Sequence, residues 1–221
     1  MKRVIKKILC TFALFAILYP AIAQHNNNNS QRLRLMINFM DFGVSHIIPT
    51  GDLSNYFAPF AGVHLGFGFE LNRFYIGAQM QGGLNWIRLN RPLLGSTTGY
   101  HRDFQKGDYF DYVENLGLIG YTLIRNRWLE LTPIIGLGTT KIRSRIYGGE
   151  SNRDEFTIVN SFTVNPGLRA DFPLIRIGEA GNHIRLRLYA GYNMPVRFRY
   201  APARGNTFSV RAGIVWWLLG D

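Results

Sequence analysis

The stretch from Ile184 to Tyr200 reads IRLRLYAGYNMPVRFRY and alternates between two kinds of side chain. One set is apolar or aromatic and consists of Ile184, Leu186, Leu188, Ala190, Tyr192, Met194, Val196, Phe198 and Tyr200. The set between them is largely small or polar and includes Arg185, Arg187, Tyr189, Gly191, Asn193, Arg197 and Arg199. Successive side chains of a β-strand point to opposite faces, so this period of two predicts a strand with one apolar and one polar face.

The same alternation recurs along the chain and predicts eight strands. We place them at 32–46, 60–71, 73–87, 110–123, 128–146, 156–172, 183–200 and 206–219. Many of these segments exceed the roughly 3–10 residues of strands in soluble domains. Their polar face is dominated by Gly, Asn, Gln, Thr, Arg and Glu, which suit a narrow lumen better than a solvated surface. The sequence therefore predicts an all-β fold, an eight-stranded antiparallel transmembrane up-and-down β-barrel of the outer-membrane kind.

The N-terminal 23 residues have the three parts of a secretory signal peptide. Four basic residues precede the apolar stretch from Ile8 to Ile22, and Ala21-Ile22-Ala23 matches a cleavage site. We therefore divide the chain into a signal peptide (1–23), a flexible Asn-rich leader (24–31) and a barrel domain (32–221). Export to the outer membrane follows, and it makes nucleic acid an improbable partner.

Composition agrees with this division. The chain has 221 residues, of which 47% are hydrophobic and 18% are charged, which disfavours intrinsic disorder. Cleavage after Ala23 removes the single cysteine, Cys10, and with it disulfides, thiol catalysis and cysteine metal ligands. It also leaves 21 Lys and Arg (25 − 4) against 14 Asp and Glu, so the net charge falls from +11 to +7.

The connections between strands suggest an orientation. Those at 72–73 and 125–127 are short and those at 49–59, 88–109 and 147–155 are long, whereas periplasmic turns are short and external loops longer. The N-terminus is therefore expected in the periplasm. Aromatic side chains are expected at the two membrane interfaces. The external set is Tyr56, Phe57, Phe60, Trp86 and Phe110, and the periplasmic set is Phe74, Trp128, Phe172, Trp216 and Trp217.

Two groups of charged residues follow from this map. A lumen charge cluster near the periplasmic end consists of Arg34, Glu70, Glu130, Arg169, Asp171, Arg185 and Arg187. Unpaired charge in a narrow interior is costly, so we expect bidentate Arg–carboxylate contacts that leave no open pore. A basic external rim includes Arg88, Arg91, Arg143, Arg145, Arg197 and Arg199, and is expected to contact lipopolysaccharide phosphates or simply solvent.

The C-terminal stretch resembles the insertion signal of outer-membrane barrels, carried here by Arg211, Gly213, Trp216 and Leu218. The resemblance implies handling by the barrel assembly machinery. In layout, the mature chain is similar to small outer-membrane barrel proteins of the Bacteroidota type, the group that includes PorT-like secretion accessories. Pro49-Thr50-Gly51-Asp52-Leu53 is similar to the first loop of that group.

Two functional classes remain open. The favoured one is a non-enzymatic barrel with a structural or interaction role, such as an envelope or secretion accessory in contact with outer-membrane lipid. The alternative is a barrel enzyme that acts on lipid A or peptides at its outer mouth, for which His64 and His101 are the candidate residues. No catalytic constellation, cofactor motif or paired metal-ligand spacing supports this alternative.

Overall fold

The computed structural model describes residues 35–83, 87–97, 100–145, 155–177, 182–198 and 205–220. The predicted signal peptide, the leader and Arg34 lie outside these ranges. The described residues belong to one compact unit, Arg34–Asp221.

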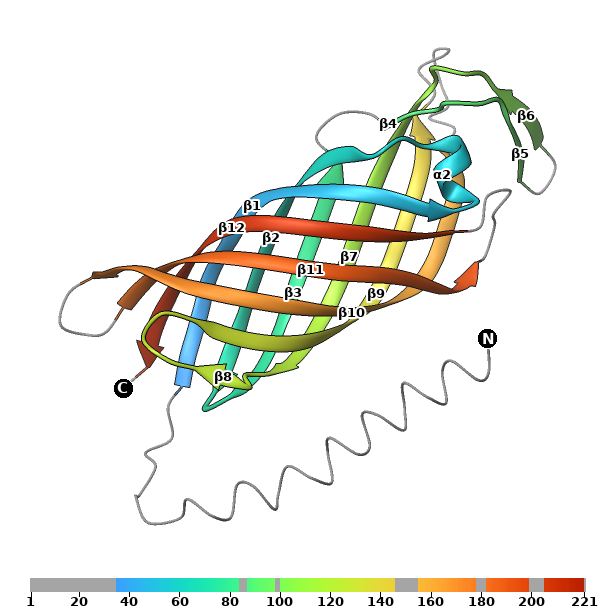
Figure 1. The fold of residues 1–221 in the computed structure, drawn as a ribbon. Coiled ribbons are helices and arrows are strands. Elements are labelled where there is room, and N and C mark those ends of the chain that lie inside the picture. The colour runs from blue at the N-terminus through green and yellow to red at the C-terminus, as the bar shows by residue number, and fades with distance from the viewer. Residues whose placement is uncertain are drawn as a thin grey trace. The chain divides into compact units, whose positions relative to one another are not determined.

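Eight long strands of this unit form a closed antiparallel barrel, which confirms the predicted fold (Figure 1). They are β1 (Leu35–Gly51), β2 (Phe60–Leu71), β3 (Phe74–Gly83), β7 (Tyr109–Tyr121), β9 (Glu130–Arg145), β10 (Glu155–Ile177), β11 (Asn182–Phe198) and β12 (Gly205–Gly220). Each pairs with the long strand before and after it, and β1 closes the barrel on β12 from Leu35↔Gly220 to Gly51↔Gly205. Closure matters because an open edge would expose a row of unpaired backbone groups.

The register fixes the tilt of the strands. A line of paired residues that leaves β10 at Phe162 and circles the barrel returns to β10 at Phe172, a stagger of ten residues (172 − 162). The line passes through Thr139, Asn115, Met80, Leu65, Phe42, Ile214 and Leu186. With eight strands spaced at the usual distance, this stagger corresponds to a tilt of roughly 40°.

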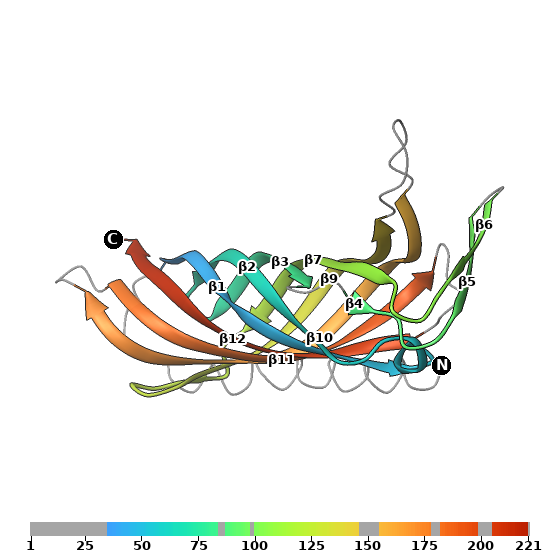
Figure 2. The same cartoon turned by 90° about the horizontal axis from the view of Figure 1, so that it is seen from above.

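Shorter elements lie at the two ends of the barrel. Helix α2 (Leu53–Tyr56), β4 (Ile87–Arg88) and the hairpin of β5 (Leu93–Thr97) with β6 (Tyr100–Phe104) lie at one end, and β8 (Ile124–Arg125) lies at the other (Figures 1 and 2). No helix in the described part of the chain is long and apolar enough to cross a membrane. The tight Asn72-Arg73 turn lies at the β8 end, whereas α2 and the elements between β3 and β7 lie at the other end. Asn72 adopts φ 57°, the left-handed conformation that Asn tolerates in turns.

The outer surface of the barrel is apolar, as the alternation predicts. Exposed side chains include Phe67 at 56%, Phe74 at 62%, Ile76 at 62% and Ile119 at 58%. On β2 the outward positions from Ala61 to Leu71 span ten residues (71 − 61). At about 3.3 Å per residue and a tilt of roughly 40°, this corresponds to an apolar band about 25 Å tall.

Three predicted interface aromatics are placed elsewhere. Trp217 is fully buried inside the barrel, because β12 alternates and its neighbour Trp216 takes the outward position. Phe57 and Phe110 are also buried, in a cluster of loop and strand residues at the α2 end. The predictions for these three residues were wrong, since aromatic character alone does not distinguish an outward ring from an inward one.

Strand β9 keeps its alternation throughout. Thr140, Ile142 and Ser144 continue the inward set of the strand without interruption. The outward set turns polar, with Lys141 exposed and Arg143 half-buried. The strand therefore extends past the apolar band without a bulge of its own.

Candidate functional site

The interior of the barrel near the β8 end contains a network of paired charges. Six of the seven residues predicted for the lumen charge cluster lie there, each 4% exposed or less: Glu70, Glu130, Arg169, Asp171, Arg185 and Arg187. Arg34 lies outside the described residues. The alternation of inward and outward residues along each strand places these side chains in the lumen. Each of them is next to an apolar residue that points outward.

Arg187 is the centre of the network. Its partner in the β10–β11 register is Asp171, and the two form a bidentate contact at 2.7 Å (Nε to Oδ1) and 2.9 Å (Nη2 to Oδ2). Its Nη1 atom donates to Oδ2 of Asp41 at 2.7 Å. One guanidinium thus joins β11, β10 and β1, and charge-assisted contacts of this fork geometry are among the stronger hydrogen bonds in proteins.

Arg169 extends the network across the lumen. Its Nε atom lies 3.3 Å from Oδ2 of Asp171, and its Nη2 atom lies 3.5 Å from Oε2 of Glu70. The same Nη2 donates to Oγ1 of Thr132 at 3.3 Å. Its guanidinium carbon lies 4.2 Å from the ring centroid of Tyr75, a cation–π arrangement that also shields the charge from water.

Arg125 and Arg185 complete the network at the β8 end. Both pair with Glu130, Arg125 through Nε at 3.0 Å, and Arg125 also pairs with Glu70. Nη1 of Arg125 donates to the backbone carbonyl of Asn72 at 2.6 Å. This side chain therefore links the β2–β3 turn to the lumen, a contact that joins two turns far apart in the sequence.

A second group of polar contacts lies nearer the middle of the barrel. Nη2 of Arg211 lies 2.6 Å from Oε1 of Glu114, and Nη1 donates to Oε1 of Gln79 at 2.6 Å. The other carboxylate oxygen of Glu114 accepts hydrogen bonds from Tyr112 at 2.8 Å and from Asn193. The group thus involves residues of β3, β7, β11 and β12.

Buried charge in these two groups is balanced. The cations are Arg125, Arg169, Arg185, Arg187 and Arg211, and the anions are Asp41, Glu70, Glu114, Glu130 and Asp171. Among the described residues of these two groups, five guanidinium groups thus face five carboxylates. A buried ion pair whose partner is removed leaves an uncompensated charge, so loss of any one of these side chains should be strongly destabilising.

Four members of the two groups were not predicted from the sequence, namely Asp41, Glu114, Arg125 and Arg211. Asp41 was missed because the register of β1 shifts between Asn38 and Met40, so that both Met36 and Asp41 point inward. Glu114 lies where neither set on β7 is cleanly apolar, and Arg125 lies in a turn. Arg211 was assigned to the insertion signal, although its alternation with Val210 and Ala212 does indicate an inward side chain.

Glycines make room for two tyrosine rings in the lumen. A Cβ at Gly68 or Gly77 would overlap the ring of Tyr75, and one at Gly167 or Gly191 would overlap that of Tyr189. Each ring is covered by a guanidinium, with Arg211 lying 4.6 Å from the centroid of Tyr189. These four inward positions therefore require glycine, because a tyrosine ring lies flat against the backbone at each of them.

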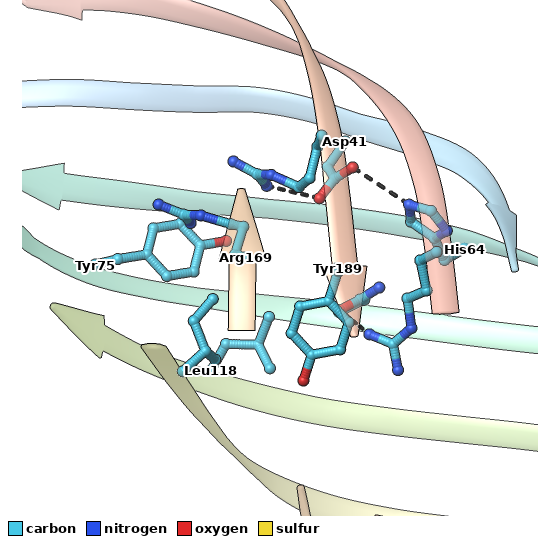
Figure 3. Close-up of a pocket in the computed structure, with 10 residues that line it drawn as sticks. Asp41, His64, Tyr75, Leu118, Arg169 and Tyr189 are labelled. Atoms are coloured by element: carbon cyan, nitrogen blue, oxygen red, sulfur yellow. Dashed lines mark hydrogen bonds and ion pairs between the residues drawn. The ribbon is translucent and has the colours of Figure 1, made fainter. Parts of the chain in front are cut away.

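His64 lies beside Asp41 and borders a small cavity. Its Nε2 atom is 3.4 Å from Oδ1 of Asp41, and Figure 3 shows the two side chains facing each other. The cavity has a volume of about 10 Å³ and is also lined by Arg169, Arg187 and Arg211. This is about the space that one water molecule occupies. His64 is 2% exposed, so its ring has little access to solvent.

The opposite end of the lumen is filled by an apolar cluster, here called the mouth cluster. It consists of Ile47, Leu53, Phe57, Ile87, Leu89, Leu93, Phe104, Phe110, Tyr112, Ile142 and Val159. Leu89, Leu93 and Phe104 come from the connection between β3 and β7, which therefore folds over the end of the barrel. Phe110 lies in edge-to-face contact with Phe57 and Phe104, at centroid distances of 5.5 and 5.2 Å.

The insertion-signal residues occupy both faces of β12. Trp216 is 40% exposed and Leu218 is half-buried, both on the outward set, whereas Arg211 and Gly213 are inward. A Cβ at Gly213 would meet Nε2 of His64 and the carbonyl oxygen of Phe42. Packing in the lumen therefore accounts for a small residue at position 213, whatever its part in insertion.

The basic rim is described in part. Arg88 and Arg91 are exposed, and Nη2 of Arg88 donates to the hydroxyl of Tyr109 at 2.8 Å. Arg143 is half-buried and its Nε atom lies 4.0 Å from Oδ2 of Asp111. The side chains of Arg145 and Arg197 and the whole of Arg199 lie outside the described residues, as does the side chain of His101. Over the described ranges, no three His, Cys, Asp or Glu side chains converge as metal ligands.

Comparisons with known proteins bear on the fold alone. No family model and no curated protein matches the chain. The solved structure of Neisserial surface protein A is similar at a TM-score of 0.53 and 9% identity, over 83% of this chain and 96% of that one. The attachment invasion locus protein Ail of Yersinia pestis, in complex with the heparin analogue sucrose octasulfate, gives a TM-score of 0.44 and 14% identity over 85% and 100%. A further structure of Ail gives 0.43 and 10% over 84% and 97%.

Proposed function

We propose that the protein is an integral outer-membrane barrel with a structural or interaction role, whose lumen is closed to ions and solutes. The observation that carries the proposal is the combination of an apolar outer band with a balanced charge network inside. A soluble barrel would have its apolar face inside and its charges outside. The height of the band, about 25 Å, is that of transmembrane barrels.

Two layers support a closed lumen. The charge network spans the interior near the β8 end, with Arg169 and Arg187 in contact with carboxylates from β1, β2 and β10. The mouth cluster fills the other end with side chains that are 3% exposed or less. An eight-stranded barrel has an interior about wide enough for side chains to fill. The two layers of side chains are therefore expected to occupy the lumen without leaving an open channel.

A non-enzymatic role fits the placement of His64, one of the two candidate histidines. A general base must come within hydrogen-bond reach of its substrate, whereas His64 is buried between Asp41 and Gly213. We therefore favour the interaction role, including that of an envelope or secretion accessory of the PorT-like kind, over action on lipid A or peptides.

The basic rim supplies a surface for outer-membrane lipid. In this orientation Arg88 and Arg91 lie on the external side, where lipopolysaccharide phosphates would accept hydrogen bonds from them. Insertion by the barrel assembly machinery, with Arg211, Gly213, Trp216 and Leu218 as its signal, belongs to the same proposal.

Conductance of the purified barrel in a planar lipid bilayer tests the closed lumen. We expect no stable single-channel current from the unaltered protein. The positive control is a variant that lacks the β3–β7 connection and also carries Arg187→Ala, so that parts of both layers are removed. In its folded form this variant is expected to conduct ions. A steady large conductance from the unaltered barrel would contradict the proposal.

Substitutions of arginines in the basic rim test the proposed binding to lipopolysaccharide. The double variant Arg88→Gln/Arg91→Gln should weaken retention of lipopolysaccharide by the detergent-solubilised protein, measured by native mass spectrometry. Arg73→Gln/Arg127→Gln, at the other end, is the matched control because it removes the same charge. Equal retention by both double variants would argue against a contact at the external rim.

A further inference from the structure

Two connections at the β8 end of the barrel form one continuous surface patch. The backbone N–H of Thr122 donates to the carbonyl oxygen of Arg73 at 2.8 Å, and Nη1 of Arg125 donates to that of Asn72 at 2.6 Å. These contacts hold the β2–β3 turn against the segment that joins β7 to β9, as can be followed in Figure 1. Side chains from both connections therefore share one surface, here called the turn patch.

The turn patch has an apolar part that continues the outer band of the barrel. Phe74 and Tyr121 form the last residue pair of β3 and β7, and their rings lie edge to face at a centroid distance of 4.8 Å. Beyond this pair, Leu123, Ile124 and Trp128 are 40%, 46% and 68% exposed. The exposed apolar surface thus runs from the barrel wall onto the connection between β7 and β9.

A basic part borders these apolar side chains. Arg73 and Arg127 are exposed, and the guanidinium carbon of Arg127 lies 4.8 Å from the ring centroid of Trp128. The turn is fixed by Asn126, whose Oδ1 atom accepts hydrogen bonds from the backbone N–H groups of Trp128 and Leu129, each at 2.9 Å. Stacking on an indole ring covers one face of a guanidinium but not its N–H groups, which lie in the guanidinium plane and can reach an acceptor there.

Exposed charge at the β8 end is positive throughout the described ranges. The exposed charged side chains there are Arg73, Arg127 and Arg176. The carboxylates of the neighbouring strand ends are 4% exposed or less and pair with arginines of the lumen, namely Glu70, Glu130 and Asp171. The basic part of the turn patch therefore attracts an anionic group from outside the barrel.

Continuity with the outer band identifies the partner as a lipid. A ligand for the turn patch needs an anionic group beside Arg127 and apolar groups beside Phe74, and Phe74 belongs to the surface that faces acyl chains in the proposed orientation. An anionic phospholipid has both parts in one molecule. An acidic protein segment would match the basic part alone.

We propose that the turn patch is a binding site for one anionic phospholipid of the periplasmic leaflet, with phosphatidylglycerol as the simplest example. The phosphate accepts hydrogen bonds from Arg73 and Arg127, and the acyl chains lie on Phe74 and Ile124. Trp128 then lies at the level of the headgroups, where an indole ring is favoured. This site goes beyond the proposed function, which concerns the lumen and the external rim, and rests on it for the orientation of the barrel.

Native mass spectrometry of the purified barrel in detergent gives the first test. The probes are phosphatidylglycerol and phosphatidylcholine with the same acyl chains, which share the apolar part and the phosphate and differ in net charge. The unaltered protein should retain one phosphatidylglycerol more tightly than phosphatidylcholine. Arg73→Gln/Arg127→Gln should weaken the retention of phosphatidylglycerol by about 10–30-fold and change that of phosphatidylcholine little.

Arg88→Gln/Arg91→Gln is the matched control, since it removes the same charge at the other end and should leave the retention of phosphatidylglycerol intact. Equal losses in the two double variants, or no loss in Arg73→Gln/Arg127→Gln, would overturn the proposal. Neither outcome bears on the closed lumen or on the external rim, because conductance and retention of lipopolysaccharide test those separately.

Tryptophan quenching keeps the proposal falsifiable if the arginine variant does not fold. A variant in which Trp128 is the sole tryptophan, with the other three replaced by Phe, is reconstituted in vesicles of phosphatidylglycerol and phosphatidylcholine at equal mole fractions. Brominated phosphatidylglycerol should quench Trp128 about twofold more strongly than brominated phosphatidylcholine does. Equal quenching by the two lipids would mean that no anionic lipid is selected, and the absence of quenching by either would mean that Trp128 does not contact lipid. Both results would overturn the proposal.

Discussion

The two ends of the lumen are lined by side chains of opposite chemistry. Near β8, side chains from six elements meet in ion pairs such as Arg187–Asp171 and Arg169–Glu70. At the other end lies the mouth cluster of buried apolar side chains, several of them from connections between strands. The charged end depends on each partner being present, whereas the apolar end depends on volume. Substitutions should therefore affect the two ends by different amounts.

Arg187→Leu should have the largest effect. It removes the cation shared by Asp171 and Asp41 and leaves two buried carboxylates under-compensated, which should lower the free energy of unfolding by about 4–5 kcal/mol. Urea titration in lipid vesicles measures this loss. Arg176→Leu, at an exposed position on the β8 end of β10, should change stability by about 0.5 kcal/mol or less. Similar losses in the free energy of unfolding for the two variants would show that the charge network does not contribute more to stability than an exposed surface residue does.

Phe110→Ala should have the next largest effect. The substitution leaves a cavity between Phe57 and Phe104 and should cost about 3 kcal/mol, together with faster proteolysis of the 88–109 connection from the external side. Phe67→Ala is its control, because Phe67 is 56% exposed on the outer face of β2, away from the mouth cluster. If Phe67→Ala accelerates proteolysis as much, the cluster does not hold the connection in place.

Gly77→Ala tests the contact between strand and ring inside the charged end. The new Cβ would overlap the Tyr75 ring, on which the Arg169 guanidinium lies, so we expect a loss of about 1–3 kcal/mol. At Gly82 on the same strand the nearest atom to such a Cβ is 3.8 Å away, and Gly82→Ala should be nearly neutral. Equal unfolding midpoints in urea for both variants would contradict this packing.

Tyr189→Phe should have the smallest effect. It removes the hydroxyl that donates to Oδ1 of Asn165 at 2.5 Å and keeps the ring beneath Arg211, so a loss of about 1 kcal/mol is expected. A double-mutant cycle with Asn165→Ala isolates the hydrogen bond. Additive losses in the cycle would indicate that the two side chains do not interact.

The strands and the direction of their side chains could be predicted from the sequence because a period of two is a local property. The alternation places Arg185 and Arg187 inside and Leu186 and Leu188 outside, as in the structure. Six of the cluster residues were found in this way. Their partners were not, because which carboxylate an arginine reaches depends on the stagger of ten residues around the barrel.

Other features depend on contacts that leave no periodic signal. The shift between Asn38 and Met40 changes which residues of β1 face inward, and only the register with β2 and β12 reveals it. The mouth cluster joins Leu53 and Phe57 to Leu89 and Phe104 across more than thirty residues of sequence, since 89 − 57 is 32. Such contacts follow from closure of the barrel, not from local composition.

Quenching of tryptophan fluorescence by brominated lipid tests most directly whether the apolar face points to acyl chains. Trp216 and Trp217 are adjacent in sequence, yet Trp216 is 40% exposed on the outer face and Trp217 is fully buried in the lumen. Two single-tryptophan variants, with the other three residues replaced by Phe, are reconstituted in vesicles brominated near the headgroup. Strong quenching of Trp216 and little of Trp217 is the expected result. Equal quenching, or stronger quenching of Trp217, would contradict the orientation of the barrel wall.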